Sequence, residues 1–422
     1  MELSRARVPA GVLNLVLAIC IIVSAIVGAL LLLVYHRNII INRNNQLAYL
    51  ERNVNSGFAY LLANKLKGAQ EKTFDLFGEG GDTVLLSNQP WGLYDVAQVQ
   101  AKAGNLIKYK SALVGGELDT LKGIALYLTD EDRPLFIAKG VAIEGNSYLP
   151  RAGVKNVSLE ATPSGDFNSI KGKVLISNRQ LPSCFQNVIE RVKKNVGYLL
   201  KEEHGERPLT LQNSNEKRLI YNSFLNPSYL IQSDDLLVLD NVALTGKVII
   251  NSMVGVVIGS KAKVKDILVS APYIIIADNF SGSLQAFAQD SIIVGKNCTM
   301  QYPSVLGLYN EKANASLVIG ESSILIGEIV LSGGPASQGL HQLSIQKQAS
   351  VSGLVYVNGL VEHLGKISGG LFCRRLMVRT PSSLYENYIT DAILSGKDLS
   401  DFFLASAELS DKGRRETIKW LN

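Results

Sequence analysis

A nine-residue pattern that returns six times in the second half of the chain constrains the fold more than any other feature. Each copy opens on Val or Ile, continues with a Gly or polar step, and places mostly small or apolar residues at its fifth and seventh positions. The copies begin at Val238, Ile258, Ile276, Val294, Ile319 and Ile345, which are 20, 18, 18, 25 and 26 residues apart. Such intervals are typical of one coil of a β-solenoid. We therefore expect a mainly β protein with a right-handed parallel β-helix over residues 229–372.

Stacking the six copies predicts which way each column of side chains points, because equivalent positions of neighbouring coils lie about 4.8 Å apart. The β-branched first column and the fifth and seventh columns should face the interior. The third column mixes acids and bases, and the fourth is rich in amides; they read Asp240, Ser260, Asp278, Lys296, Glu321, Lys347 and Asn241, Lys261, Asn279, Asn297, Ser322, Gln348. We expect both polar columns on the outer edge, with side-chain ladders in the fourth.

The N-terminus contains a candidate membrane span. From Val8 to Tyr35 the chain carries no charged residue, and about 20 apolar residues are enough to cross a bilayer as a helix. The apolar run is longer than that of a secretory signal, which favours an uncleaved anchor that meets the lipid bilayer through residues 11–35. Almost the whole chain follows this single span. We therefore expect a single-pass membrane protein whose large domain is extracytoplasmic.

An amphipathic helix is predicted to continue the span. Leu47, Leu50, Val54, Phe58 and Leu61 recur at intervals of three and four residues, with polar residues between them. About the first 65 residues resemble type IV pilin-like proteins, which have a short basic leader ending in Gly, an apolar stretch and a helix leading into a β-rich module. Here Gly11 ends the leader. The fifth residue after it is Val16, where the family usually has Glu, so processing by a prepilin peptidase is an expectation only of the resemblance.

The remaining boundaries follow from changes in residue pattern. We expect a tail and transmembrane helix at 1–35, the helical extension at 36–67 and a β-rich module at 68–182, in which Phe136–Gly145 already resembles one coil. A helical insertion or cap is expected at 183–228, with Val188, Val192, Val196 and Leu199 on one face and packed over the open first coil. Residues 373–422 should form a C-terminal cap or tail.

Charge and cysteine content exclude several classes of protein. The net charge of +5 is small for 422 residues, and the Lys and Arg residues are scattered without interleaved aromatics, so no nucleic-acid partner is expected. The four cysteines share no ligand spacing, which argues against a disulfide framework and a zinc site. Cys298 occupies an interior position of the repeat, where we expect a small buried side chain.

An enzymatic function has limited support. Asp240 and Asp278 would form a carboxylate pair only if they shared a cleft, and two coils predict a separation nearer 10 Å. The Ile-Gly steps also resemble those of left-handed hexapeptide acyltransferases, in which His341 or His363 could serve as a base, but the later spacings break that pattern. The sequence has no nucleophile elbow, phosphate loop or metal constellation. We predict no catalytic, cofactor-binding or metal-binding residues and no enzyme activity.

The recurring Val/Ile-x-small-x-Val-x-Gly pattern of the repeat is similar to that of bactofilin-type modules, which are β-helical and form polymers. The similarity covers roughly residues 231–370. It implies a membrane-anchored structural or assembly protein of the cell envelope, with like subunits or other envelope proteins as partners. The alternative is a carbohydrate-active or acyl-transfer enzyme on a β-helix. A third possibility, an adhesin or polysaccharide-binding stalk, requires exposed aromatic ladders, of which the outer columns show few.

Overall fold

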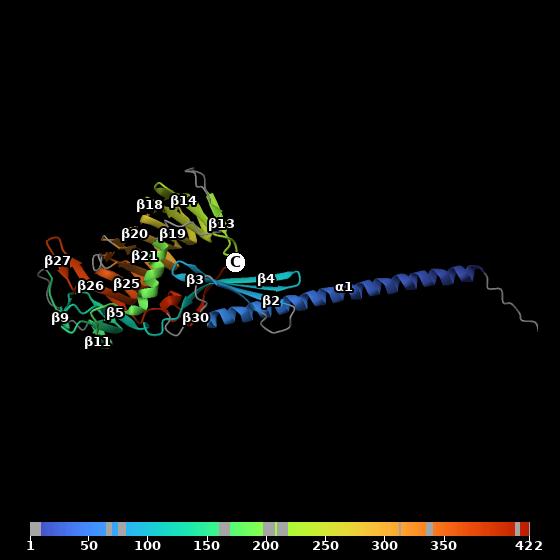
Figure 1. Ribbon diagram of the computed structural model, residues 1–422, viewed down its shortest axis with the longest axis horizontal. Coiled ribbons are helices and arrows are strands. Elements are labelled where there is room, and N and C mark those ends of the chain that lie inside the picture. The colour runs from blue at the N-terminus through green and yellow to red at the C-terminus, as the bar shows by residue number, and fades with distance from the viewer. Residues whose placement is uncertain are drawn as a thin grey trace, which may run out of the picture. The chain divides into compact units, whose positions relative to one another are not determined.

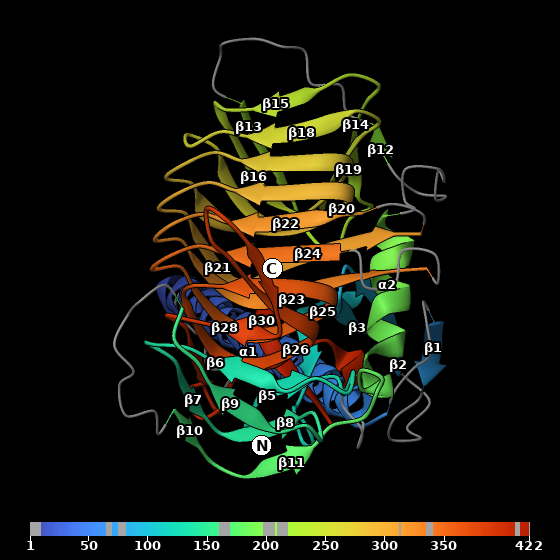
Figure 2. The same ribbon diagram turned by 90° about the vertical axis from the view of Figure 1, so that its left-hand side faces the viewer.

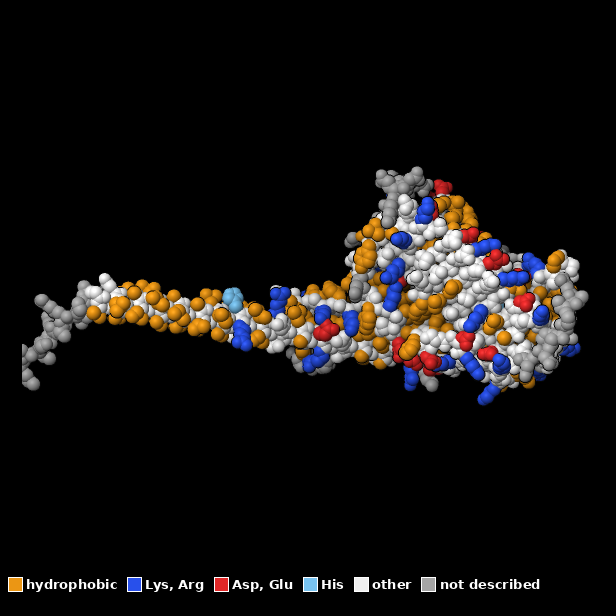
Figure 3. All heavy atoms as spheres, turned by 180° about the vertical axis from the view of Figure 1, so that it is seen from behind, with side chains coloured by type: hydrophobic (Ala, Val, Ile, Leu, Met, Phe, Trp, Pro, Cys, Tyr) orange, Lys and Arg blue, Asp and Glu red, His pale blue; other side chains and the backbone are white. Residues whose placement is uncertain are grey.

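The fold was examined in a computed structural model, which describes residues 10–64, 70–74, 82–159, 169–196, 207–208, 218–311, 314–334, 341–409 and 414–421. Its N-terminal element is a single helix, α1 (Ala10–Ala63), of 54 residues (Figure 1). Residues 11–48 of this helix are exposed, and the helix is long and apolar enough to cross a membrane. Figure 3 shows these apolar side chains along the helix, followed by the first His and Arg side chains. The leader up to Pro9 lies outside the described residues.

The predicted amphipathic stripe is present in the second half of α1. Leu50, Val54, Phe58 and Leu61 are buried, whereas Leu47 is 36% exposed. Helix and strand residues approach closely here: a Cβ at Gly57 would lie 3.0 Å from side-chain atoms of strand residues. Five strands form one sheet in the order β1 (Gln70–Phe74), β2 (Asp82–Trp91), β3 (Tyr94–Ala103), β4 (Leu106–Gly116) and β30 (Arg415–Leu421), and the C-terminal β30 pairs antiparallel with β4.

The largest part of the chain is a ladder of parallel strands that form three walls (Figure 2). Five long strands, β19 (Lys263–Ile276), β20 (Ser281–Val294), β21 (Thr299–Asn310), β25 (Ser350–His363) and β26 (Lys366–Arg379), bend and contribute to more than one wall. Wall A also contains β13 (Arg218–Asn222), β16 (Val242–Gly246), the first part of β23 (Ile324–Gly333), β29 (Ile393–Ser395), β7 (Ala142–Glu144) and β10 (Ile170–Lys171). Wall B contains β14 (Tyr229–Ser233), β17 (Val248–Ser252), the rest of β23, β5 (Ile124–Leu128), β8 (Asn146–Leu149) and β11 (Val174–Ile176). Wall C contains β15 (Leu237–Leu239), β18 (Gly255–Ile258), β22 (Ser316–Ile319) and β24 (His341–Ile345).

Six of these parallel strands close on themselves. The pairing runs from β20 to β21, β23, β25, β24 and β22, and returns from β22 to β20. The ring closes because the bent strands β20 and β25 each pair in two walls. Its interior holds the main hydrophobic core of the ladder.

The predicted interior columns are buried, with one exception. Ile258, Ile276, Ile319 and Ile345 are fully buried, as are most residues of the fifth and seventh columns. The exception is Val238, which is 52% exposed. Its neighbour Leu239 is the residue that pairs with Ile258, whereas Leu244 at the seventh position pairs with Val264 as expected. The first copy is therefore one residue shorter than the second between these two positions, and Val238 lies on the opposite face of its strand from Leu239.

The fourth column occupies a strained turn. Asn279, Asn297, Ser322 and Gln348 all have left-handed backbone, with φ between 54° and 62°. Asn tolerates this region better than most residues other than Gly. Ser322 Oγ donates to Gln348 Oε1 at 3.1 Å, one rung of the expected side-chain ladder.

Glycines form the corner between walls A and B. Gly353 has a φ of 147°, and a Cβ there would overlap the carbonyl oxygen of Gly327 in the preceding coil. Gly369 stands in the same relation to Gly353. Neighbouring strands therefore approach so closely at this corner that a side chain would collide with the backbone.

The order of strands in space differs from their order in the sequence. Leu371, Phe372 and Cys373 of β26 pair with residues 126–128 of β5, and β29 pairs with β7. Strands from the predicted β-rich module at 68–182 therefore extend the ladder beyond its C-terminal coil. Of the segment 136–145, β7 belongs to this ladder, whereas β6 (Leu135–Ile137) lies in a separate three-stranded sheet between β28 (Tyr388–Ile389) and β9 (Val154–Asn156). The ladder thus extends past the expected range of 229–372, and part of the expected C-terminal cap, β29, also belongs to it.

Helix α2 (Gln186–Val196) lies against the side of the ladder and not over an end. It buries Val188, Ile189, Val192 and Val196 and contacts β19, β20, β21 and β23 (Figure 2). Ser270 Oγ donates to the Asn195 carbonyl at 3.0 Å. The position differs from the expected cap because the outer face of wall B is itself apolar and needs a cover. Leu199, expected on the same helical face, lies outside the described residues.

Candidate functional site

The two aspartates of the repeat lie on an exposed turn and not in a cleft. Asp278 Oδ1 accepts a hydrogen bond from the backbone N–H of Lys296 at 2.7 Å, and Asp240 lies against Gly259 of the next coil. The Asp278 carboxylate therefore joins its turn to the neighbouring strand connection. Neither aspartate lines the two pockets described below.

The two histidines and Cys298 are in the interior. His341 and His363 are 0% and 3% exposed, and burial lowers the pKa of both, to about 4 for His363. A His363 ring nitrogen lies 3.3 Å from the Ile393 carbonyl oxygen. Burial raises the pKa of the Cys298 thiol, which is the state of an unreactive structural cysteine. These positions suit packing, because none of the three side chains is accessible to a substrate.

An aromatic column runs along the outer face of wall B. Register places Tyr356 opposite Phe372, Phe372 opposite Tyr127, and Tyr127 opposite Tyr148. The Tyr127 and Tyr148 rings are stacked with centroids 5.3 Å apart, and Phe185 packs on Tyr356 and Phe372. Phe185 and α2 cover the part of the column nearer β20. The column continues past the end of this cover to Tyr127 and Tyr148.

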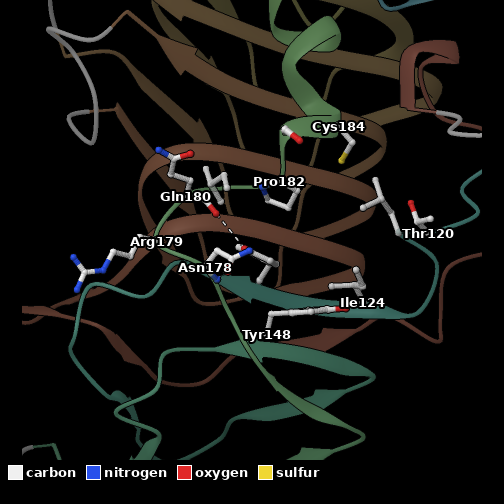
Figure 4. A pocket seen from close by; sticks show the side chains of 12 residues that line it. Thr120, Ile124, Tyr148, Asn178, Arg179, Gln180, Pro182 and Cys184 are labelled. Carbon is white, nitrogen blue, oxygen red and sulfur yellow. Dashed lines mark hydrogen bonds between the residues drawn. The ribbon is translucent and has the colours of Figure 1, made fainter.

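A pocket of about 670 Å³ opens where the cover ends. Its lining combines the tyrosine pair with Thr120, Leu121, Ile124 and residues 178–184, the segment that leads from β11 into α2. Figure 4 shows Tyr148 and Ile124 on one side and Pro182 and Cys184 on the other. Tyr127 is held in place through its hydroxyl, which donates to the Gln180 carbonyl at 3.1 Å and accepts from the Asn178 N–H at 3.2 Å.

A second pocket, of about 570 Å³, shares residues 179–181 with the first. It adds the acid Glu190 as well as Gln186, Tyr309, Tyr356, Asn358 and Arg374, and the two pockets adjoin at the shared segment. Residues 179–181 therefore line both halves of the combined site.

The arginines that line the two pockets are paired with acids. The Arg179 guanidinium lies 2.8 Å from Asp132 and points away from the first pocket (Figure 4). Arg374 and Arg375 both bind Glu131, at 2.9 and 2.5 Å. Burial alone would raise the pKa of Glu131, but hydrogen bonds from the two guanidinium groups lower it. The lining of the first pocket contains no Asp, Glu, His or Lys, and therefore offers no carboxylate or imidazole as a general base.

A buried polar cluster joins α2, β3 and the C-terminal segment. Arg191 Nη2 lies 2.7 Å from Asp95 and 2.9 Å from Glu408, and Asp95 also pairs with Arg415 at 3.1 Å. Arg415 donates to the carbonyls of Leu61 and Asn64, at the C-terminal end of α1, at 2.7 and 3.0 Å. These bonds satisfy carbonyls that a helix end leaves without partners.

Both ends of the ladder expose apolar strand residues. At one end Val174, Leu175 and Ile176 of β11 are 57%, 39% and 65% exposed. At the other end Leu219 and Tyr221 of β13 are 78% and 59% exposed. Among the described residues, β11 pairs with β8 and β13 pairs with β16, so each strand lies at an edge of the ladder.

Sequence inspection missed the aromatic column. Tyr127 and Tyr148 are 21 residues apart, and Tyr356 and Phe372 are 16 apart, intervals near one coil that could have indicated each pair separately. Only the pairing of β26 with β5 joins the two pairs. Comparison with protein-family models, with curated proteins and with solved structures found no match for this chain. The functional conclusion therefore rests on the geometry.

Proposed function

We propose that this chain is a membrane-anchored structural or assembly protein of the cell envelope. Its parallel ladder is then a right-handed β-helix, held at the membrane by α1, with the large domain on the extracytoplasmic side. The observation that carries the proposal is the exposure of apolar strand residues at both ends of the ladder, at Ile176 and Leu219.

The physical reason lies in the strand edges. An end strand of a sheet has N–H and C=O groups that only another strand can pair in a dry environment, and exposed apolar side chains beside them favour such pairing. All strands in the walls run parallel, so the two ends present opposite edges of the same ladder. One end of a molecule can therefore continue the other end of the next. This head-to-tail contact does not close and leads to open polymers.

The alternative, a carbohydrate-active or acyl-transfer enzyme, has less support. Its candidate residues are turn-stabilising aspartates and buried histidines with lowered pKa values. A structural role needs no reactive group at these positions. The aspartates and histidines then serve the coil, and the surfaces at the ends serve assembly.

The test is the oligomeric state of the full chain in detergent, measured by light scattering over a hundredfold range of concentration. We expect concentration-dependent oligomers that Ile176→Glu and Leu219→Glu each abolish. Ile293→Glu is the matched control, because Ile293 is 42% exposed on β20 inside the ladder and should leave assembly intact. A monomer at every concentration would refute the proposal, as would oligomers that survive both end substitutions.

Membrane orientation has a separate test. Protease added to intact spheroplasts should digest the region after Tyr35 if the large domain is extracytoplasmic. Complete protection of that region would place it in the cytoplasm.

A further inference from the structure

We infer that the pocket between Tyr148 and residues 178–184 binds a neutral, linear oligosaccharide. This inference does not depend on assembly at the ladder ends. It starts from an aromatic surface that the structure leaves partly uncovered. Tyr148 is half-buried and stacks on Tyr127, at the point where the cover provided by Phe185 and α2 ends.

The aromatic surface is rigid before any ligand arrives. Tyr127 is 6% exposed, and its hydroxyl bonds to the backbone at Asn178 and Gln180 fix the ring on which Tyr148 rests. A sugar ring has an apolar C–H face that packs on an aromatic ring. Because the platform is preorganised, little side-chain freedom is lost when a ligand binds.

The polar groups around the platform are neutral. Thr120, Asn178, Gln180 and Ser183 bring hydroxyl and amide groups to the pocket lining. Hydroxyls and primary amides both donate and accept hydrogen bonds, as sugar hydroxyls do. The pocket thus combines an apolar platform with a few polar groups, the composition expected of a small-molecule site.

In the first pocket, charge argues against an ionic ligand. The single charged residue in the lining, Arg179, is paired with Asp132 and points away from the pocket (Figure 4). A carboxylated sugar or a phosphate would lose its hydration without gaining an unpaired cation in the first pocket. A neutral sugar loses less on entry.

The adjoining second pocket favours a chain over a single sugar. Its lining adds Tyr309, Asn358 and Gln186 beyond the shared residues 179–181. Each pocket has a volume within the range of about 300–1,000 Å³ that is usual for ligand sites. A linear oligosaccharide can occupy both pockets by passing over the shared segment.

The experiment measures binding of cellohexaose and chitohexaose to the full chain by isothermal titration calorimetry. The detergent should carry no sugar headgroup, because a maltoside would compete for the site. We expect saturable binding of at least one of the two probes, with hexagalacturonate bound at least tenfold more weakly. Tyr148→Ala should weaken binding at least tenfold, and Tyr148→Phe should change it less than threefold because the ring is retained.

Two further variants distinguish a loss of binding from a loss of folding. Asn178→Ala changes an exposed side chain and should weaken binding about threefold or more without altering the melting temperature. Tyr221→Ala removes a tyrosine that is 59% exposed on β13, far along the ladder, and should bind as the unaltered chain does. The inference is overturned if neither neutral probe binds at millimolar concentration, if hexagalacturonate binds as tightly as they do, or if Tyr148→Ala and Asn178→Ala both bind normally. None of these results would affect the oligomer test at Ile176 and Leu219, so the two proposals can fail separately.

Discussion

Replacing Glu328 with Gln should stabilise the protein at pH 8 and remove part of its pH dependence. Glu328 lies in β23 and is 1% exposed, and its Oε1 accepts the backbone N–H of Ser406 at 2.7 Å. Burial raises the pKa of this carboxyl from 4.5 to about 7, although the Ser406 bond, Tyr94 and Arg191 lower it in part. The Tyr302 side chain is the remaining titratable neighbour, and burial raises its pKa as well.

The direction of this pH dependence follows from proton binding. The folded chain holds the Glu328 proton more tightly than the unfolded chain, so the contribution of Glu328 to the free energy of unfolding is highest below pH 4.5 and is lost as the pH rises to about 7. A shift of about 2.5 pH units corresponds to about 3 kcal/mol. Gln keeps an oxygen for the Ser406 N–H and carries no charge at any pH. Glu328→Gln should therefore gain up to about 3 kcal/mol over the unaltered chain at pH 8 and almost nothing at pH 4.5.

Urea unfolding of the full chain in detergent, followed by tryptophan fluorescence at several pH values from 4.5 to 8, measures this difference. The difference between the two chains isolates Glu328 from the other titrating groups. Glu416→Gln is the control, because its side chain is exposed on β30. If the unfolding free energies of the Glu328→Gln and unaltered chains run parallel across the pH range, the carboxyl does not ionise within that range and the reasoning is refuted.

Three other substitutions test the fold. Arg415→Ala leaves Asp95 buried without one of its cations and should lower the free energy of unfolding by about 3–5 kcal/mol in urea titrations; Asp95→Asn in the same chain should recover part of the loss. Gly353→Ala should prevent folding or lower the melting temperature sharply, because a Cβ there overlaps the neighbouring strand. Gly104→Ala is the control and should cost about 1 kcal/mol, because Gly104 has φ 55° but faces open space. Equal losses would contradict the close approach of the strands at Gly353. The lowered pKa of His363 means that the unfolded chain binds more protons between pH 6.5 and 4, so stability should fall with acid, and His363→Gln should reduce that fall in the same urea titrations.

The local sequence predicted the interior of the ladder well. A β-branched residue at the start of each copy, as at Ile258 and Ile345, favours a buried position in a strand, and such residues recur at the start of every copy of the repeat. The same holds for the N-terminal helix, because apolar length and the three-to-four periodicity of Leu50, Val54 and Phe58 are properties of consecutive residues. Val238 was wrongly predicted to be buried, because a strand with apolar residues on both faces does not show from sequence alone which face is inside.

The candidate binding site could not be predicted in this way. Tyr127 and Tyr148 belong to strands of four or five residues, and Phe372 is more than two hundred residues away in the sequence. Nothing in either segment specifies the other as a neighbour, since parallel pairing is made by backbone groups that every residue carries. The uncovered part of the aromatic column depends as well on where Phe185 and α2 stop.

By itself, then, the sequence determined the membrane-length helix, the mainly β body and the direction of most repeat side chains, because each depends on the spacing of neighbouring residues. Tertiary structure alone decided that β5 and β8 extend the ladder beyond β26, that α2 covers wall B and not an end, and that a tyrosine-lined pocket remains beside it. These outcomes depend on which edges and apolar faces are left after the coils have stacked. That is a property of the assembled ladder, and no single segment contains it.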